Sequence, residues 1–316
     1  MGDNSMRIVL NHDDPPRWLY DGKLGVDLLF DESTYDEMEK TMRLLESVDK
    51  GRITELIPVL IGEKPPSFKE LKPINSYGLN ESQNEALALV AAAKDLALVH
   101  GPPGTGITTT IVHAISRVLE DEKQVLVCAA SNSAVDLIVE KLHREDVKVL
   151  RLGHPGRVDE EVVSHTIDVQ LSQHDDSKML KDLRKRSEEM RSLGRKYKRN
   201  FGREEKEQRR MLLDEAKKLK QDARLLEDHM IHQLLQEAQV IACTLIGSNS
   251  DYLRGRYFST LFIDEASQAL EPASWVPILK ADRIIMAGDH QQLPPTVKSK
   301  EAGREGGGQG GGEGGE

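Results

Sequence analysis

The sequence has few cysteines, no long apolar run and no overall excess of positive charge. Cys128 and Cys243 are the two cysteines among its 316 residues, and each lies in an apolar stretch. Their number and spacing predict neither a disulfide framework nor a metal site, so we expect two reduced thiols in the core of an intracellular protein. No apolar stretch approaches the roughly 20 residues of a membrane span. The N-terminus also lacks the pattern of a signal peptide or a myristoylation site, so we expect no membrane partner and a location in the nucleus or cytoplasm.

Charge is unevenly distributed along the chain. The net charge of -10 does not indicate nucleic-acid binding, yet residues 178–224 hold 18 Lys and Arg against 9 Asp and Glu. A basic region in an acidic protein is either a solvated surface or a contact for phosphates, and the sequence leaves both open. The hydrophobic fraction of 38% permits a real core, and the length suits one large domain or two modest ones.

Short apolar runs alternate with amphipathic segments from residue 79 onward. Helical patterns cover residues 79–93, where Asn80 is a candidate N-cap, and residues 108–119. The strand-like runs are residues 95–100, 124–129, 147–152, 240–244, 260–263 and 283–287. This alternation, with nearly continuous apolar strands, predicts an α/β fold whose parallel sheet is covered on both faces.

A long polar segment, residues 175–237, interrupts the alternation between the third and fourth strands. Asn200, Phe201 and Gly202 divide it into two arms. In the second arm apolar residues recur at spacings of 4, 3, 4, 3 and 4, namely Leu212, Ala216, Leu219, Ala223, Leu226 and Met230. Because this is the spacing of a two-stranded coiled-coil seam, we expect an antiparallel helical hairpin that carries the basic region.

The two ends of the chain differ from this pattern. Residues 1–72 mix β-like runs, MRIVL and VDLLF, with an amphipathic stretch at 34–48. Residues 303–316 are rich in glycine and have nothing to bury, so we expect them to be disordered.

The stretch HGPPGTGITTT, residues 100–110, matches most of the phosphate-loop pattern G-x-x-x-x-G-K-[ST]. Gly101, Gly104 and Gly106 let the backbone approach an anion closely, and the Thr108 hydroxyl suits Mg²⁺. Ile107 stands where the lysine belongs and cannot neutralise phosphate charge. By itself this loop fits a phosphate site and a structural turn equally well.

Polar residues also follow two other apolar runs. LFIDEASQ places Asp264, suited to Mg²⁺, beside Glu265, suited to act as a general base, although the pair also fits a helix N-terminus. IIMAGDHQQLPP places Gln292 where its amide can sense a γ-phosphate, although a capped turn fits as well. Upstream, Gln83 in LNESQNEAL has an amide that can pair with adenine, but a lone glutamine on a helix is usually solvated.

Together these motifs resemble the first motor domain of superfamily 1 helicases of the Upf1-like group. Within the group, the nearest resemblance is to the immunoglobulin mu-binding-protein-2 type and its fungal counterparts, the DNA polymerase alpha-associated helicases. It covers roughly residues 20–302 and rests on LNESQ, GPPGTG with TT, CAASNSAVD, RLGHPGR, DEASQ and GDHQQLPP.

The resemblance implies a RecA-like domain, residues 73–174 and 238–302, that uses ATP and Mg²⁺ and moves 5′ to 3′ on single-stranded RNA or DNA. It implies a helical insertion at 175–237 and part of a small barrel or stalk at 1–72. Carried over by position, Gln83 reads adenine, Thr108 and Asp264 hold Mg²⁺, and Glu265, Gln268 and Gln292 are catalytic. The phosphate-site residues are Gly101, Gly104, Thr105, Gly106, Ile107, Thr108 and Thr109, and the nucleic-acid contacts are Ser131, Asn132 and Thr244.

The chain departs from the family pattern in two places. Ile107 replaces the loop lysine, and after GDHQQLPP the sequence runs into the glycine-rich end rather than a second RecA-like domain. That domain supplies the arginine that is typically worth ~10³–10⁵ in rate. We therefore expect negligible ATP hydrolysis and no unwinding by this polypeptide alone. The alternatives are a nucleic-acid-binding remnant without turnover and the product of a truncated gene.

Overall fold

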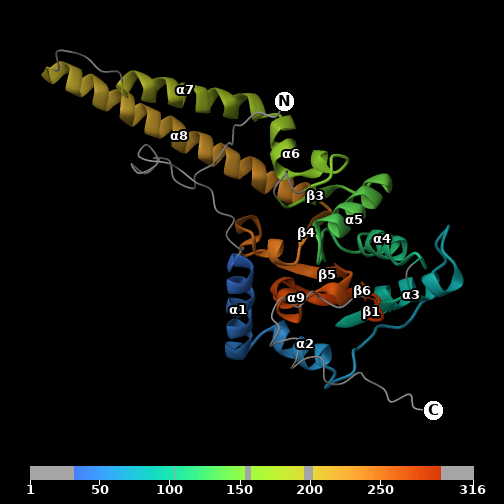
Figure 1. Ribbon diagram of the computed structural model, residues 1–316. Coiled ribbons are helices and arrows are strands. Elements are labelled where there is room, and N and C mark those ends of the chain that lie inside the picture. The colour runs from blue at the N-terminus through green and yellow to red at the C-terminus, as the bar shows by residue number, and fades with distance from the viewer. Residues whose placement is uncertain (1–31, 103, 154–157, 196–201, 293–316) are drawn as a thin grey trace, which may run out of the picture.

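The computed structural model describes residues 32–102, 104–153, 158–195 and 202–292 (Figure 1). Within them, six parallel strands form one sheet in the order β1-β6-β5-β2-β4-β3. Their bounds are β1 Leu96–His100, β2 Val125–Ala129, β3 Val149–Arg151, β4 Val240–Thr244, β5 Phe258–Asp264 and β6 Ala281–Gly288. The predicted parallel α/β sheet is confirmed, and each predicted run overlaps one strand.

Helices cover both faces of the sheet. One face packs against α3 (Glu81–Ala92), α4 (Ile107–Val118) and α5 (Asn132–Arg144). The other packs against α1 (Glu32–Ser47), α2 (Arg52–Leu60) and α9 (Glu271–Ile278). The remaining short helices are α6 (Ile167–Gln173), η3 (Val163–His165), η4 (Ile246–Asn249), η5 (Asp251–Leu253) and η6 (Ala266–Gln268). No helix in the described ranges is both long and apolar enough to cross a bilayer.

The two cores explain why the strands are almost wholly apolar. Successive side chains point to opposite faces, so Phe262 packs with α3, α4 and α5 whereas Ile263 packs on the side of α1, α2 and α9. Cys128 of β2 and Cys243 of β4 lie side by side in register, fully buried, with sulfur atoms 3.7 Å apart. Both are free thiols in the core, as predicted.

The predicted insertion is a helical hairpin, α7 (Ser177–Arg195) and α8 (Arg203–Glu237), that projects away from the sheet (Figure 1). Of the seam residues predicted in the second arm, four are buried and two are partly buried; the buried ones are Ala216, Leu219, Ala223 and Met230. Across the hairpin, Arg184 pairs with Glu227 at 2.6 Å and the Ser187 hydroxyl donates to the Ala216 carbonyl at 2.8 Å. The apolar seam therefore holds two otherwise polar helices together.

The N-terminal segment is helical where the structure describes it. The predicted amphipathic stretch at 34–48 forms most of α1, and α2 inserts the fully buried Leu56 against the sheet. The β-like runs at 6–10 and 26–30, and the glycine-rich residues 303–316, lie outside the described residues.

Candidate nucleotide-binding site

The glycine loop joins β1 to α4 and needs its glycines. Gly104 and Gly106 have φ values of 83° and 82°, a left-handed conformation that favours glycine. At Gly101 a Cβ atom would lie 2.7 Å from the Thr105 hydroxyl oxygen, which is too close. That hydroxyl donates to the Pro102 carbonyl at 2.7 Å and so closes the turn. The backbone conformation therefore favours glycine at 104 and 106, and close packing favours it at 101.

Helix α4 begins without a capping side chain. Asn80 caps α3 by accepting from the Gln83 N–H at 2.9 Å, and Ser131 caps α5 by accepting from the Ala134 N–H at 3.1 Å. Gly106 at the start of α4 has no side chain to do this, and the first turn holds no acidic residue. Helix N-termini carry unpaired N–H groups and partial positive charge, so this end of α4 suits an anion.

Ile107 is accommodated without disturbing the loop. It is the first residue of α4 and packs against the core beneath α3, α4 and α5. Its Cγ1 atom would lie 3.0 Å from a Cβ on Gly101, so the side chain folds back over that glycine. The loop thus has no lysine charge at this position, while Gly104 and Gly106 hold the left-handed conformation described above.

The loop opens onto a cleft of about 370 Å³ at the carboxyl edge of the sheet. Parallel strands end at the same edge, and polar residues that follow β1, β5 and β6 therefore meet there. From the predicted site the cleft gathers Gly104, Gly106, Ile107, Thr108, Asp264, Glu265, Gln268 and Gln292. Gln83, Gly101, Thr105 and Thr109 are not among the residues that line it.

Asp264 is a buried acid at the end of β5, with 4% of its surface exposed. The pKa of its carboxyl group is raised to about 6, chiefly by burial and in smaller part by the neighbouring Glu265 carboxylate. The Glu265 N–H and the Lys141 ammonium oppose this rise. Because Thr108 lies in the same cleft, a hydroxyl and a carboxylate offer the oxygen ligands that Mg²⁺ prefers, so these residues fit that ion.

Glu265 adopts a left-handed backbone conformation, φ 50°, that is rare for a residue with a side chain. It begins the turn of η6, where the Gln268 N–H donates to the Glu265 carbonyl at 3.0 Å. Such strain costs of order 1–3 kcal/mol and clusters at functional sites. The turn directs the strand-end acids and Gln268 into one cleft.

Two predicted site residues, Gln83 and Thr109, do not line the cleft and form hydrogen bonds with other residues. The Gln83 amide accepts from the Asn80 N–H at 2.9 Å and donates to the Thr105 carbonyl at 3.0 Å. It thus ties α3 to the glycine loop. The Thr109 hydroxyl accepts from the ammonium group of Lys141 at 3.2 Å. Lys141, which the sequence reasoning missed, comes from α5 and lines the cleft itself.

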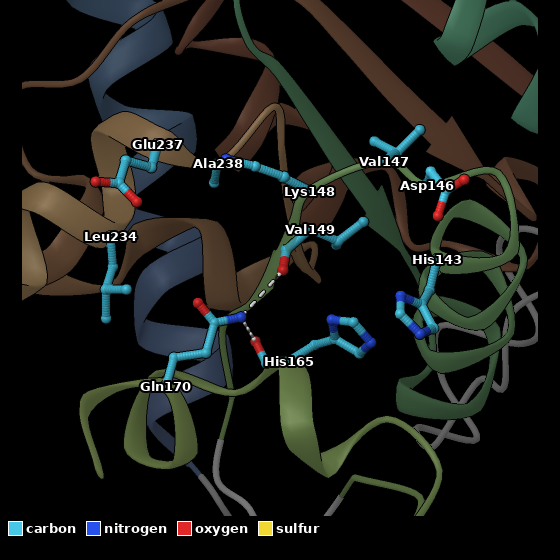
Figure 2. A pocket seen from close by; sticks show the side chains of 10 residues that line it. All are labelled: His143, Asp146, Val147, Lys148, Val149, His165, Gln170, Leu234, Glu237 and Ala238. Atoms are coloured by element: carbon cyan, nitrogen blue, oxygen red, sulfur yellow. Dashed lines mark hydrogen bonds between the residues drawn. The ribbon is translucent and has the colours of Figure 1, made fainter. Parts of the chain in front are cut away.

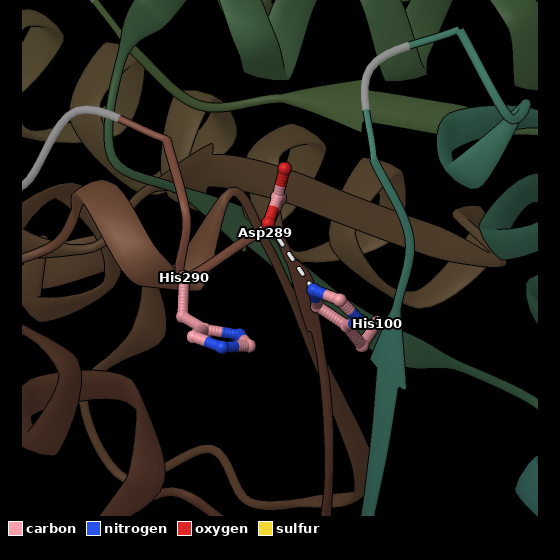
Figure 3. Close-up of side chains that lie close together, drawn as sticks. All are labelled: His100, Asp289 and His290. Carbon is pink, nitrogen blue, oxygen red and sulfur yellow. Dashed lines mark hydrogen bonds and ion pairs between the residues drawn. The ribbon is translucent and has the colours of Figure 1, made fainter.

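His100 and Asp289 join the end of β1 to the segment after β6, a link that the sequence reasoning also missed. The His100 Nε2 and Asp289 Oδ1 atoms are 3.1 Å apart, and the His100 and His290 rings lie 4.7 Å apart (Figure 3). The other Asp289 oxygen accepts from the Gln292 amide at 3.4 Å. The Gln291 N–H, and then His100, lower the pKa of Asp289. This carboxylate therefore helps to position Gln292 at the cleft.

The three predicted nucleic-acid residues lie at the carboxyl ends of β2 and β4 and do not line the cleft. Ser131 and Asn132 follow β2, and Thr244 ends β4, where it pairs in register with Ala129. Asn132 accepts from the Arg151 guanidinium at 2.9 Å, and Thr244 accepts from the Gly247 N–H at 3.2 Å. Their side chains thus also organise the chain locally, as Ser131 does in capping α5.

A second hollow, of about 380 Å³, lies at the start of the edge strand β3 (Figure 2). His143 and His165 meet there edge to face with ring centroids 4.6 Å apart. Burial, and then the charge of His143, lower the pKa of His165. The Gln170 amide donates to the Val149 carbonyl at 3.3 Å. This hollow shares no lining residue with the cleft at the glycine loop.

Comparison with known proteins agrees with this geometry. The family described as AAA domain matches residues 78–300. The mouse (Mus musculus) DNA-binding protein SMUBP-2 is 37% identical over 281 residues, which is 87% of this chain and 28% of that protein. The Schizosaccharomyces pombe DNA polymerase alpha-associated DNA helicase A is 37% identical over 287 residues, 88% of this chain and 42% of the relative.

The ATP-dependent helicase upf1 of Schizosaccharomyces pombe is 34% identical over 294 residues, 88% of this chain and 29% of the relative. The chain thus spans less than half the length of these relatives. The family match runs from the cap of α3 through the residues that follow β6, and so includes every strand of the sheet and the whole cleft. The chain therefore belongs to the AAA-domain family, in the Upf1-like group of superfamily 1 helicases.

Proposed function

We propose that this chain is the ATP-binding motor domain of a helicase that acts on single-stranded RNA or DNA in the 5′ to 3′ direction. The cleft supports this proposal, because the glycine loop, the acids after β5 and Gln292 after β6 meet in one space. If the loop were only a structural turn, there would be no reason for the segments after β5 and β6 to place carboxylates and an amide in the same cleft. Such a motor works where nucleic acids are kept, in the nucleus or cytoplasm.

The cleft residues divide the chemistry of hydrolysis among them. The loop and the first turn of α4 bind the phosphates through N–H groups, with Gly101 and Thr105 shaping the loop behind them. Thr108 and Asp264 hold Mg²⁺, which neutralises phosphate charge when bound. Glu265 accepts a proton from the attacking water, whose oxygen bonds to the γ-phosphorus as the bond to the leaving ADP breaks.

Gln268 and Gln292 couple the state of the γ-phosphate to the path of the nucleic-acid strand, and Gln83 reads adenine beside the loop. Ser131, Asn132 and Thr244 lie along the same sheet edge, where they contact the nucleic-acid backbone. The basic hairpin of α7 and α8 extends this path with contacts that neither depend on base sequence nor survive high salt.

Ile107 weakens the site without removing it. Its side chain leaves the phosphate cradle intact but provides no charge for the γ-phosphate. We therefore propose that the chain binds Mg-ATP and by itself retains only a residual, nearly negligible turnover. The same residue favours a second candidate function, a nucleotide-dependent nucleic-acid binder that does not hydrolyse ATP.

The experiment compares binding and turnover in the full chain. A fluorescent ATP analogue is titrated with Mg²⁺, and phosphate release is followed with and without oligo(dT) and oligo(U). Glu265→Gln should abolish residual turnover and retain binding, whereas Glu145→Gln, at the exposed end of α5, should change neither. Ile107→Lys should tighten Mg-ATP binding.

The outcomes separate the candidates. Binding with no detectable turnover would select the binder without hydrolysis. No binding at millimolar nucleotide would reject both candidates, as would residual turnover that is indifferent to Glu265.

A further inference from the structure

Lys141 places a positive charge in the cleft from a direction that the phosphate-loop pattern does not cover. It lies in the last turns of α5, is partly buried, and lines the cleft with Thr108, Asp264 and Glu265. Its ammonium group donates a hydrogen bond of 3.2 Å to the Thr109 hydroxyl on α4. The lysine therefore crosses from one helix to the next and is held at the phosphate side of the site.

Among the described residues, Lys141 forms no close ion pair with an acid. At hydrogen-bond distance, its ammonium group meets the Thr109 hydroxyl rather than a carboxylate. By contrast, Arg144, one turn later on the same helix, is paired with Glu140. The charge of Lys141 nevertheless affects the electrostatics of the cleft, because it opposes the rise of the Asp264 pKa.

We propose that Lys141 replaces the missing loop lysine and binds the β- and γ-phosphates of ATP from the wall formed by α5. This inference rests on the proposed function, since it assigns a residue to the same nucleotide site. Thr109 is then a positioning residue, because it holds the ammonium group beside the first turn of α4.

Two features of the cleft favour such a cation. The described residues of the loop carry no charged side chain, and Ile107 adds an apolar group beside them. On the facing side stand two acids, Asp264 and Glu265. A triphosphate brought between them is repelled unless positive charge enters with it, and one Mg²⁺ offsets only part of that charge. Lys141 supplies a charge that can donate directly to phosphate oxygens.

The test measures nucleotide affinity rather than activity. The full chain is titrated calorimetrically with Mg-ATP, Mg-ADP and AMP. A hydrogen bond from a charged donor corresponds to roughly a 10- to 100-fold change in affinity. Lys141→Met should therefore weaken Mg-ATP binding by roughly 10- to 100-fold and Mg-ADP binding by less, and should leave AMP unchanged. Lys123→Met, an exposed lysine that precedes β2, is the matched control and should leave all three affinities unchanged.

A second substitution tests whether a lysine at position 107 can replace Lys141 in binding the phosphates. When added to Lys141→Met, Ile107→Lys should raise the affinity for Mg-ATP at least tenfold. Made alone in the unaltered chain, it should raise the affinity by less, because Lys141 already provides a cation for the phosphates. Thr109→Val should weaken Mg-ATP binding less than Lys141→Met does. Circular dichroism and thermal melting confirm that each variant folds.

A probe of the unaltered chain avoids the folding question altogether. Acetylation of Lys141, followed by mass spectrometry, should be slowed by Mg-ATP and not by AMP, whereas that of Lys123 should be unaffected. If the unaltered chain binds Mg-ATP but Lys141→Met binds it equally well, or Lys141 is not protected, the inference fails and the proposed function stands. If no nucleotide binds to the unaltered chain, the proposed function itself fails.

Discussion

Replacing Asp264 with asparagine should stabilise the folded chain at neutral pH. Burial holds the pKa of this carboxyl group at about 6, against 3.8 when exposed. The folded state thus binds the proton more tightly than the unfolded chain does. The contribution of Asp264 to stability is full below pH 3.8 and is lost as the pH rises through 6.

The size of the effect follows from the shift. At 1.36 kcal/mol per pKa unit, the ionised carboxylate costs up to about 3 kcal/mol of unfolding free energy above pH 7. Asparagine carries no charge and retains an oxygen that can accept from the Glu265 N–H. We expect Asp264→Asn to be about 2–3 kcal/mol more stable than the unaltered chain at pH 7.5, and within about 0.6 kcal/mol of it at pH 4.

Urea unfolding followed by circular dichroism, at both pH values and with EDTA present, measures this difference. Asp175→Asn, which removes an exposed carboxylate, is the control and should change stability little at either pH. Equal stability of Asp264→Asn and the unaltered chain at pH 7.5, or a gain of the same size at both pH values, would refute a desolvated acid at this position.

Three further substitutions probe the surrounding structure. Gly106→Ala should cost about 1–2 kcal/mol in urea unfolding, because φ is 82° and the new Cβ would lie 2.8 Å from the Gln83 amide nitrogen; an unchanged midpoint would contradict the left-handed loop. Asp136→Ala should cost about 3–5 kcal/mol in the same assay, because it leaves the fully buried Arg151 without the carboxylate that now lies 2.8 Å away; a loss below about 1 kcal/mol would show that the charge reaches water. The pKa of His165 is lowered from 6.5 in the folded chain. Its neutral ring therefore contributes to the stability of the fold above pH 6.5, and this contribution is lost as the pH falls. His165→Asn should therefore flatten the fall in melting temperature between pH 7 and 5, and an unaltered slope would exclude His165 as its source.

Local patterns predicted the parts of the site that lie at strand ends. Asp264 and Gln292 each follow an apolar run, and a parallel sheet brings such ends to one edge, so their meeting in the cleft was predictable. The N-cap role of Asn80 was likewise readable from its place before a helical pattern. These inferences need only the neighbours of a residue along the chain.

Contacts between distant segments were not readable in this way. Lys141 stands 32 residues after Thr109, and the direction of its side chain depends on how α5 crosses α4. His100 and Asp289 are 189 residues apart and meet because β1 and β6 are adjacent in the sheet. The Gln83 amide looked like a solvated side chain, yet it binds the glycine loop. No periodicity in the sequence specifies these pairings.

Patterns along the chain were enough to predict the parallel sheet, the helical hairpin, the glycine loop and the isoleucine at position 107 in place of lysine. Each follows from short-range physics: alternation of apolar residues, spacing along a helix, and the backbone freedom of glycine. Helix packing, by contrast, sets which charges share the cleft. Electrostatic forces act through space, so Lys141 on α5 opposes the rise of the Asp264 pKa although the two residues are far apart along the chain.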